Sequence, residues 1–499
     1  MFRPSLQEFE HLAADAGLVP IYREIVADLD TPLTIFAKVA GGESHAFLFE
    51  SLEGGEKWGR YSFIGFDPIV TMSSRGTQIT ITREGKSEQQ EGDPLQALQA
   101  LLKSFDACNA EMGCDSELLP RFFGGAVGFL GYDMVRFMER LPERNPPLAQ
   151  FPDSAFMVPR TVLIYDNLRQ LLTVVNLVQT AGAQDLPALY AKAQAEIEEV
   201  IVRLQAPMPT EYLGGAGVKA KTHAFTSNMS EEAFAEMVEA AKEYVQAGDV
   251  IQVVLSQRFH TKTELSPFKL YRALRHINPS PYLFYLKLGD LVQIGSSPEI
   301  LVRLEQGDIE LRPIAGTRKR GKTEEEDAAL EQELLADPKE RAEHLMLVDL
   351  GRNDVGRVAQ YGSVEVRDLL VVERYSHVMH LVSGVHGTLA PGKDQFDVLR
   401  ACFPAGTVSG APKIRAMEII EELEPERRGP YAGSVGYFGF SGNMDFCITI
   451  RTFVMQGDDL WVQAGAGIVA DSVSALEYQE TINKSMGLRR AVELAEKEF

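Results

Sequence analysis

The chain has 499 residues, enough for two domains or for one heavily elaborated domain. Its 45% hydrophobic and 24% charged residues are ordinary for a soluble globular protein. The formal net charge of −22 argues against nucleic acid or an anionic membrane as the main partner, because both repel an acidic protein.

The cysteines and the N-terminal residues indicate in which cellular compartment the protein works. The four cysteines are too few for a disulfide scaffold and lack the spacing of zinc ligands, so we expect reduced thiols at Cys108, Cys114, Cys402 and Cys447. The first residues have no basic flank followed by an apolar core, and no apolar run approaches the roughly 20 residues that span a bilayer. We therefore expect a soluble, cytoplasmic protein.

Helix and strand patterns alternate in the N-terminal part. Apolar spacing predicts helices at residues 1–14, 95–105 and 186–204, strands at 44–50, 61–65, 77–83 and 122–132, and a hairpin at 161–178. From residue 205 to residue 228 the pattern gives way to Pro, Gly, Thr and Lys, with a glycine-rich run from Gly214 to Gly217. This segment is the predicted linker between a domain at 1–210 and another at 220–499.

The C-terminal part has sharper signals. Ser230 can cap a helix that Gly248 ends, and further helices are predicted at 324–336, 338–349, 412–423 and 474–497. Strands are predicted at 250–259, 364–372, 377–385, 434–440, 446–455 and 460–464, with hairpins at 282–294 and 300–314. Strands in meanders and helices in blocks indicate an α+β fold, with large antiparallel β-sheets packed face to face and covered by helices.

Two Glu-x-x-Glu pairs, Glu340/Glu343 and Glu477/Glu480, each lie in a predicted helix. A spacing of three residues places both carboxylates of a pair on one helix face. Four carboxylates brought together repel unless a cation lies between them, and an all-oxygen ligand set favours Mg²⁺. The alternative is two solvated acidic faces, with Glu480 and Lys484 as a surface ion pair.

Other features are compatible with a chemical role but also have plain structural explanations. The turn from Gly406 to Lys413 can cradle an anion at a helix N-terminus, or it is an ordinary left-handed turn. Arg451, predicted on a strand, can bind a carboxylate with its guanidinium group, or it is a salt-bridge partner. Taken alone, His380 is a satisfied core histidine and Glu299 a surface acid.

Several motifs together resemble the chorismate-utilising enzymes. They are Pro313-Ile-Ala-Gly-Thr-Arg318, Lys339-Glu-Arg-Ala-Glu-His-Leu-Met-Leu-Val-Asp349, Gly406-Thr-Val-Ser-Gly-Ala-Pro-Lys413, Tyr431, Gly465-Ala-Gly467 and Glu477-Tyr-Gln-Glu-Thr-Ile-Asn-Lys484. The resemblance runs from about Phe47 to Lys484 and is closest to the component I branch of anthranilate synthases, which serves tryptophan biosynthesis. It implies a regulatory domain at 1–210 and a chorismate-binding catalytic domain at 220–499.

The resemblance implies how the substrate is bound. Glu343 and Glu480 are expected to hold Mg²⁺, which takes the ring carboxylate of chorismate. Glu340 and Glu477 are expected to complete the acidic shell at the substrate. The other expected substrate contacts, some of which hold the enolpyruvyl carboxylate, are Gly316, Thr317, Tyr431, Arg451, Gly465, Ala466, Gly467 and Lys484.

Three residues are implied in the chemistry. Glu299 is the expected general acid, which protonates the departing C4 hydroxyl group while ammonia attacks C2. This role requires a carboxyl group that a desolvated site keeps protonated. His380 is expected to serve the second step, in which the C2 proton and pyruvate leave and the ring becomes aromatic. Thr407 is expected near the leaving hydroxyl group.

Two positions separate the chain from relatives with other nucleophiles. Aminodeoxychorismate synthases have a nucleophilic lysine where this chain has Ala315, and isochorismate and salicylate synthases have a water-activating lysine where it has Gln252. Without either lysine, ammonia is the expected nucleophile. The alternatives are an enzyme that stops at aminodeoxyisochorismate, then an aminodeoxychorismate synthase, and from another class a non-catalytic amino-acid sensor.

The ammonia needs a source. Glutaminases carry a cysteine on a tight turn, typically Gly-x-Cys-x-Gly, and none of the four cysteines has these neighbours. The resemblance therefore implies a separate glutamine amidotransferase subunit, component II, that supplies ammonia to this chain.

A regulatory site is also implied, between the domains. Residues 48–51 (Leu-Phe-Glu-Ser) and 278–285 (Asn-Pro-Ser-Pro-Tyr-Leu-Phe-Tyr) resemble two elements of the tryptophan site in feedback-inhibited relatives, with Phe49 in place of their leucine. The expected tryptophan contacts are Glu50, Ser51, Pro281, Tyr282 and Leu283, with Glu50 accepting the ammonium group. The alternative is ordinary sheet packing of both segments.

Overall fold

The computed structural model describes residues 1–51, 59–108, 119–148, 150–213, 223–375 and 378–499. Its α-helices are α1 (Leu6–Asp15), α2 (Pro32–Val39), α4 (Pro94–Lys103), α5 (Leu186–Gln205), α6 (Glu231–Ala247), α7 (Pro267–Ile277), α8 (Glu324–Ala336), α9 (Pro338–Gly356), α10 (Gln395–Cys402), α11 (Gly406–Ser409), α12 (Lys413–Leu423) and α13 (Ser474–Glu498). Its strands are β1 (Phe2–Arg3), β2 (Leu18–Val26), β3 (His45–Glu50), β4 (Tyr61–Arg75), β5 (Gln78–Arg83), β6 (Lys86–Glu91), β7 (Gly125–Leu130), β8 (Ser154–Asp166), β9 (Leu171–Gln179), β10 (Thr226–Ser227), β11 (Gln252–Lys262), β12 (Tyr282–Leu288), β13 (Leu291–Ser297), β14 (Ile300–Glu305), β15 (Asp308–Leu311), β16 (Ile314–Lys319), β17 (Glu365–Arg374), β18 (Val378–Thr388), β19 (Gly410–Ala411), β20 (Ser434–Gly439), β21 (Met444–Ile448), β22 (Thr452–Gln456) and β23 (Asp459–Ile468).

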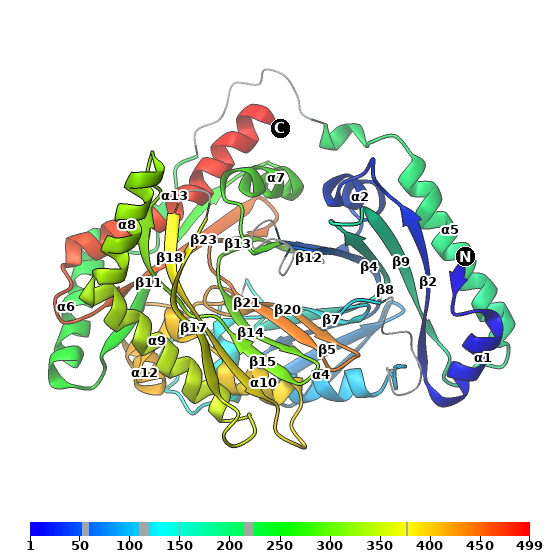
Figure 1. The fold of residues 1–499 in the computed structure, drawn as a ribbon, viewed down its shortest axis with the longest axis horizontal. Coiled ribbons are helices and arrows are strands. Elements are labelled where there is room, and N and C mark those ends of the chain that lie inside the picture. Colours follow the sequence, from blue (N-terminus) through cyan, green and yellow to red (C-terminus); the bar gives the residue numbers. More distant parts are fainter. Residues whose placement is uncertain (52–58, 109–118, 149, 214–222, 376–377) are drawn as a thin grey trace.

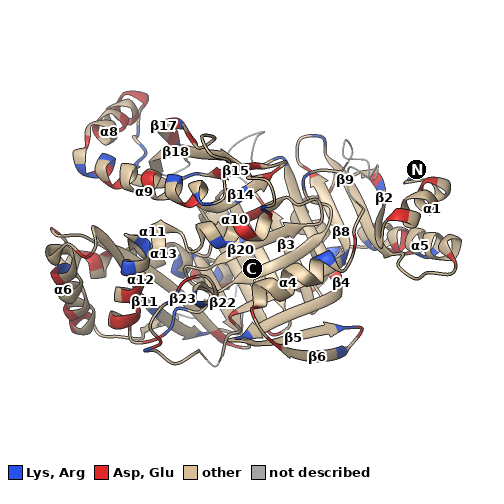
Figure 2. Ribbon diagram, turned by 90° about the horizontal axis from the view of Figure 1, so that it is seen from below, with Lys and Arg blue, Asp and Glu red and all other residues tan. Residues whose placement is uncertain are grey.

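These strands form one hydrogen-bonded network, and helices lie along its outside (Figure 1). Helices α1 and α5 lie on one side of the molecule, whereas α6, α8 and α9 lie on the opposite side. Figure 2 shows Asp and Glu along outer helices such as α6 and α8, whereas a central strand such as β20 carries no charged residue. The α+β class with helix-covered antiparallel sheets is confirmed.

Local sequence signals explain where the predicted helices begin and end. Ser230 caps α6 by accepting a hydrogen bond from the Ala233 amide, and Gly248 ends it in the left-handed conformation, at φ of +82°. Asp337 caps α9 by accepting from the amides of Lys339 and Glu340. The cap therefore fixes the turn of α9 on which the first acidic pair begins.

The N-terminal and C-terminal parts of the chain share sheets and cores. Strand β3 pairs with β12, with Glu50 opposite Leu283, and β7 pairs with β20. The rings of Phe36 and Phe268 stack at 5.1 Å between centroids, so the apolar cores also mix the two parts. The division at residues 210 and 220 stays a prediction, and residues 214–222 lie outside the described part.

One predicted strand is wrong. The chain at 446–455 forms two strands, β21 and β22, because the backbone at Arg451 turns to a φ of +52° between them. Apolar alternation continues through the turn without glycine or proline, so the sequence pattern gives no signal of the break. Arg451 therefore lies in a turn, where its carbonyl accepts from the Ser296 amide at 3.1 Å.

The cysteines differ in part from the expectation. Cys108 is disulfide-bonded, so the prediction of a reduced thiol is wrong there, whereas Cys402 and Cys447 are free and buried. Cys114, the glycines at 214–217 and the predicted strand start at His377 lie outside the described residues. Within the described residues, no helix is long and apolar enough to cross a membrane.

We predict that a fragment of residues 1–210 does not fold by itself. Without β12 and β20 it exposes the edges of β3 and β7 and an apolar surface that the rest of the chain covers. Urea unfolding followed by circular dichroism should show no cooperative transition for the fragment and a cooperative one for the full chain. A cooperative transition of the fragment would instead favour an autonomous N-terminal domain.

Candidate active site

The first acidic pair projects from the N-terminal turns of α9. Glu340 accepts a hydrogen bond from Arg318 Nη1 at 3.1 Å. A Cβ atom on Gly316 would lie 3.2 Å from Glu340 Oε2, and Gly316 has a φ of +66°. A glycine at this position of the 313–318 motif thus lets the backbone turn close to the carboxylate.

Glu343 connects α9 to the second acidic helix. Its Oε1 lies 3.4 Å from Gln252 Nε2 of β11. Burial raises the pKa of Glu343, and the negative charges of Glu340 and Glu480 raise it further. Because Glu480 belongs to α13, the structure brings the two acidic pairs within electrostatic reach of each other.

The second acidic pair lies on α13 with a lysine beside it. Lys484 Nζ is 2.6 Å from Glu480 Oε1 and donates to the Gly465 carbonyl at 2.9 Å. Burial raises the pKa of Glu477, and the charge of Glu480 adds to this effect. The acids are therefore more than two independent solvated faces, since their charges oppose one another.

The chemistry of this donor set fits Mg²⁺. Magnesium prefers oxygen ligands, and one or two protein carboxylates suffice when water and substrate oxygens complete its shell. A cation would also relieve the repulsion between Glu343 and Glu480. Among the described residues, however, no three His, Cys, Asp or Glu side chains converge on one point as metal ligands. The metal-binding roles stay predictions.

A buried acid lies between β13 and β14. Glu299 is only 5% exposed, and Thr407 Oγ1 donates to its Oε1 at 2.6 Å. Burial raises the pKa of Glu299 to about 8, although hydrogen bonds from Thr407 and from the Ile314 backbone act in the opposite direction. The carboxyl group is therefore protonated at neutral pH, and the alternative of a surface acid is wrong.

His380 lies on β18 and faces Gly316. Its Nδ1 is 2.9 Å from the Gly316 carbonyl oxygen and 3.1 Å from Thr317 Oγ1. Because a carbonyl only accepts hydrogen bonds, Nδ1 carries the hydrogen and Nε2 of the neutral ring has the lone pair. Burial lowers the pKa of His380. The ring is thus in the form that accepts a proton at neutral pH.

Arg451 and Tyr431 form a site suited to a carboxylate. No hydrogen bond or ion pair joins the Arg451 guanidinium to another described residue, and burial lowers its pKa. Tyr431 is buried, which raises its pKa to about 12, so its hydroxyl group remains a donor. The two side chains interact electrostatically. A desolvated cation beside a hydroxyl donor favours an anionic ligand.

The glycines of β23 allow neighbouring side chains to approach. A Cβ atom on Gly465 would lie 2.8 Å from the Tyr431 hydroxyl oxygen, and one on Gly467 only 2.2 Å from Gln252 Nε2. Ala466 is fully buried in the apolar cluster beneath α6 and α12, so only its backbone is available to a ligand. The strand therefore presents a bare backbone beside Tyr431.

Sequence reasoning missed Arg428, a fully buried arginine that joins several of these elements. Its guanidinium binds both carboxylate oxygens of Glu424, at 2.9 and 2.7 Å. It also donates to the carbonyls of Val408, beside Thr407, at 2.7 Å and of Val254 at 2.6 Å, and lies 5.7 Å from the Tyr431 ring centroid. The sequence feature that could have pointed to Arg428 is the Arg-Arg pair at 427–428, directly before the Gly-Pro-Tyr segment.

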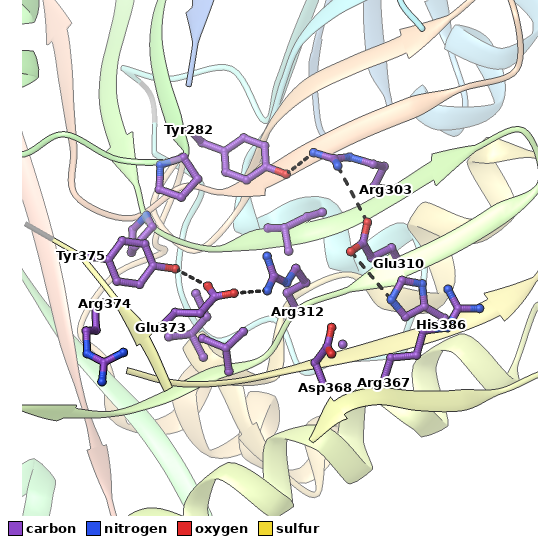
Figure 3. Close-up of a pocket in the computed structure, with 16 residues that line it drawn as sticks. Tyr282, Arg303, Glu310, Arg312, Arg367, Asp368, Glu373, Arg374, Tyr375 and His386 are labelled. Carbon is purple, nitrogen blue, oxygen red and sulfur yellow. Dashed lines mark hydrogen bonds and ion pairs between the residues drawn. The ribbon is translucent and has the colours of Figure 1, made fainter. Parts of the chain in front are cut away.

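A cavity of about 780 Å³ is lined by residues of several strands, among them β14, β17 and β18 (Figure 3). Val382, Gly384 and His386 line it, and by strand alternation His380 lies on the same face of β18. Tyr375, whose ring is 5.5 Å from that of His380, also lines it and donates to Glu373. This volume is in the range of small-molecule sites, about 300–1,000 Å³.

A pocket of about 60 Å³ brings together all five residues expected to bind tryptophan, namely Glu50, Ser51, Pro281, Tyr282 and Leu283. Glu50 already has a cationic partner, because Arg275 Nε and Nη2 bind its two oxygens at 3.0 and 3.1 Å. The Tyr271 hydroxyl also donates to Glu50. Whether this pocket binds tryptophan stays a prediction, but its residues are assembled.

Comparisons with known proteins show the family to which the chain belongs. The sequence profile of the family described as chorismate binding enzyme matches residues 45–490. The chain is 50% identical to anthranilate synthase component 1 of Aquifex aeolicus (strain VF5), covering 99% of this chain and 98% of that protein. It is 47% identical to the protein of the same name from Acetivibrio thermocellus, covering 99% of both.

Solved structures show the same fold. The crystal structure of anthranilate synthase component I from Streptococcus pneumoniae TIGR4 superposes with a TM-score of 0.75 at 36% identity, covering 93% of this chain and 99% of that one. MenF, the menaquinone-specific isochorismate synthase of Escherichia coli, is 21% identical with a TM-score of 0.70, covers 98% of this chain and 99% of that one, and supports the fold alone. The chain belongs to the chorismate binding enzyme family.

Proposed function

We propose that the chain is the chorismate-converting component of an anthranilate synthase, a cytoplasmic lyase that forms anthranilate and pyruvate from chorismate and ammonia. The observation that carries this proposal is the pairing of opposite protonation states: a buried Glu299 kept protonated and a His380 kept neutral. An acid and a base are what the two steps require. The full-length relatives that are named anthranilate synthase component 1 support the assignment.

Substrate binding follows from the charges of the site. Arg451 and Tyr431 would take the enolpyruvyl carboxylate, with Lys484 adding positive charge nearby. Glu343 and Glu480 would hold Mg²⁺, which when bound neutralises the ring carboxylate and acts as a Lewis acid. Without that cation the acidic helices would repel the dianionic substrate, since like charges oppose each other across a desolvated site.

Two residues of the chain, Glu299 and His380, would each carry out one proton transfer. The Glu299 carboxyl group gives its proton to the C4 hydroxyl group, which leaves as water while ammonia attacks C2. His380 Nε2 takes the C2 proton, and the electron pair of that C–H bond completes the aromatic ring as the bond between the ring and the enolpyruvyl oxygen breaks. The departing enolpyruvate then takes up a proton and becomes pyruvate. Burial serves both steps, because it keeps the acid protonated and the base neutral.

We predict that Glu299→Gln lowers kcat for anthranilate formation by about 10²–10⁴-fold, since an amide does not supply the proton. Glu299 acts in its protonated form, so activity at a fixed free-ammonia concentration should fall as the pH rises through about 8. Thr407→Val removes a hydrogen bond that lowers this pKa, so the alkaline limb should move to higher pH, whereas Thr407→Ser should keep it. Anthranilate fluorescence measures each rate. An alkaline limb that Thr407→Val does not shift would contradict the assignment.

We predict that the isolated chain uses ammonium but not glutamine. The described free cysteines, Cys402 and Cys447, are buried, and burial raises the pKa of both thiols, which is the opposite of a glutaminase nucleophile. Anthranilate formation by the purified chain should therefore require ammonium, and glutamine should become a substrate only after an amidotransferase subunit is added. Glutamine-dependent turnover by the chain alone would contradict this prediction.

We also propose feedback inhibition by tryptophan at the pocket around Glu50. At about 60 Å³ the pocket is far smaller than a typical ligand site. Tryptophan would bind only to an enlarged form and would shift the chain toward it. The pocket shares Pro281, Tyr282 and Arg303 with the large cavity. Enlargement of the pocket would therefore also change the shape of the large cavity beside β14 and β18.

We predict that Ser51→Ala and Pro281→Ser each raise the half-inhibitory tryptophan concentration by about 5-fold or more, with little change in the uninhibited rate. Lys287→Ala is the matched control, because Lys287 lies on the same strand as Tyr282 but outside the pocket. Inhibition curves at fixed chorismate test all three variants. Equal inhibition of Ser51→Ala, Pro281→Ser and the unsubstituted chain would remove the proposed site.

A further inference from the structure

His344 is a buried polar residue of α9, and the proposed mechanism does not use it. It directly follows Glu343, but its side chain is turned away from solvent and is 0% exposed. Its Nε2 lies 2.7 Å from Ser383 Oγ on β18. Its Nδ1 has no hydrogen-bond partner among the described residues. An apolar residue would avoid this unpaired nitrogen, so the ring must be explained by the contact that it does make.

The contact lies at the start of the packed part of α9. His344 is the first buried residue of the helix, and those that follow it are Leu347, Val348, Gly351, Asp354 and Val355. The turns before it, which carry Glu340 and Glu343, have no buried residue of their own. His344 is thus the anchor in the core that lies nearest to the two carboxylates.

Ser383, the partner of His344 in this contact, is itself held in place by a further hydrogen bond. Ser383 follows His380 by three residues, so the two side chains leave opposite faces of β18. Ser383 Oγ also accepts from the Leu370 amide at 2.9 Å. Leu370 lies in a β-bulge of β17, where it has a φ of +57°, a strained conformation for leucine that persists only where the surroundings hold it.

We propose that His344 is a positioning residue: through Ser383 it sets where the carboxylates of Glu340 and Glu343 stand relative to His380. This inference rests on the proposed function, because it concerns the same metal and substrate site. A residue that orients metal-binding carboxylates from behind typically changes metal affinity by about 10–100-fold when it is removed. The expected defect is therefore in cation binding rather than in folding.

Two substitutions of His344 separate the contact from the ring itself. In H344Q the side-chain amide reaches about the position of Nε2 and can still bind Ser383, whereas in H344N it reaches only the position of Nδ1, which has no partner. S383A removes the contact from the strand side without opening a large cavity. The double variant H344N/S383A tests whether both substitutions remove one interaction.

Cation binding is measured with Mn²⁺, an oxygen-preferring substitute for Mg²⁺, from the electron paramagnetic resonance signal of the free ion. Chorismate and ammonia are absent, so this readout does not depend on turnover. The Mg²⁺ concentration for half-maximal activity and the thermal unfolding midpoint are measured in parallel. We expect H344N and S383A to weaken Mn²⁺ binding by about 10-fold or more and H344Q to stay within about threefold of the unsubstituted chain. The double variant should bind as weakly as either single one.

Other outcomes overturn the proposal. Equal binding by H344N and H344Q, unchanged binding by S383A, or additive losses in the double variant would show that the contact does not position the carboxylates. A chain that binds no Mn²⁺ before substitution would overturn the cation site together with the positioning role. A chain that binds Mn²⁺ but makes no anthranilate would overturn the proposed function alone.

Discussion

The buried ion pair of Arg428 and Glu424 is the interaction on which the site depends. A buried charge is tolerated only with a full set of partners, and losing one partner of such a pair typically costs about 3–5 kcal/mol. Here the partners are backbone groups of the site itself: the Val408 carbonyl beside Thr407, and the Val254 carbonyl and Ser256 amide of β11. Satisfying the pair therefore holds these segments in one arrangement.

Burial also sets the protonation states of Glu299 and His380, the two residues for which we propose proton transfers. Desolvation keeps Glu299 protonated and His380 neutral, so neither needs a charged neighbour to reach its working state. Desolvation also lowers the pKa of Arg451, which has no ion-pair partner among the described residues. The acidic pairs are the opposite case, since burial and the negative charge of Glu480 together raise the pKa of Glu343 on α9 and of Glu477 on α13, an arrangement that favours the proposed cation. One physical effect, desolvation, thus supports both the proposed proton transfers and the proposed affinity for a charged substrate.

The two cavities share the lining residues Pro281, Tyr282 and Arg303, and a polar network includes the last two. The Tyr282 hydroxyl donates to Asp445 at 2.9 Å, and Arg303 binds both residues. Arg303 also lies 3.8 Å from Glu310, which faces His386 in the large cavity (Figure 3). We therefore expect a change in the pocket around Glu50 to reach β14 and β18 through these ionic contacts. The proposed inhibition by tryptophan would thus have a physical route without contact between inhibitor and substrate.

The sequence by itself determined the features that depend on neighbouring residues. These are the caps of α6 and α9, the spacing of the acidic pairs and the motifs that identify the family, because capping and periodicity act within a few residues. Only the tertiary structure decided the protonation of Glu299, the turn at Arg451 and the anchoring of Arg428 and His344. Burial and hydrogen-bond partners come from segments far apart in the chain, and no local pattern records them.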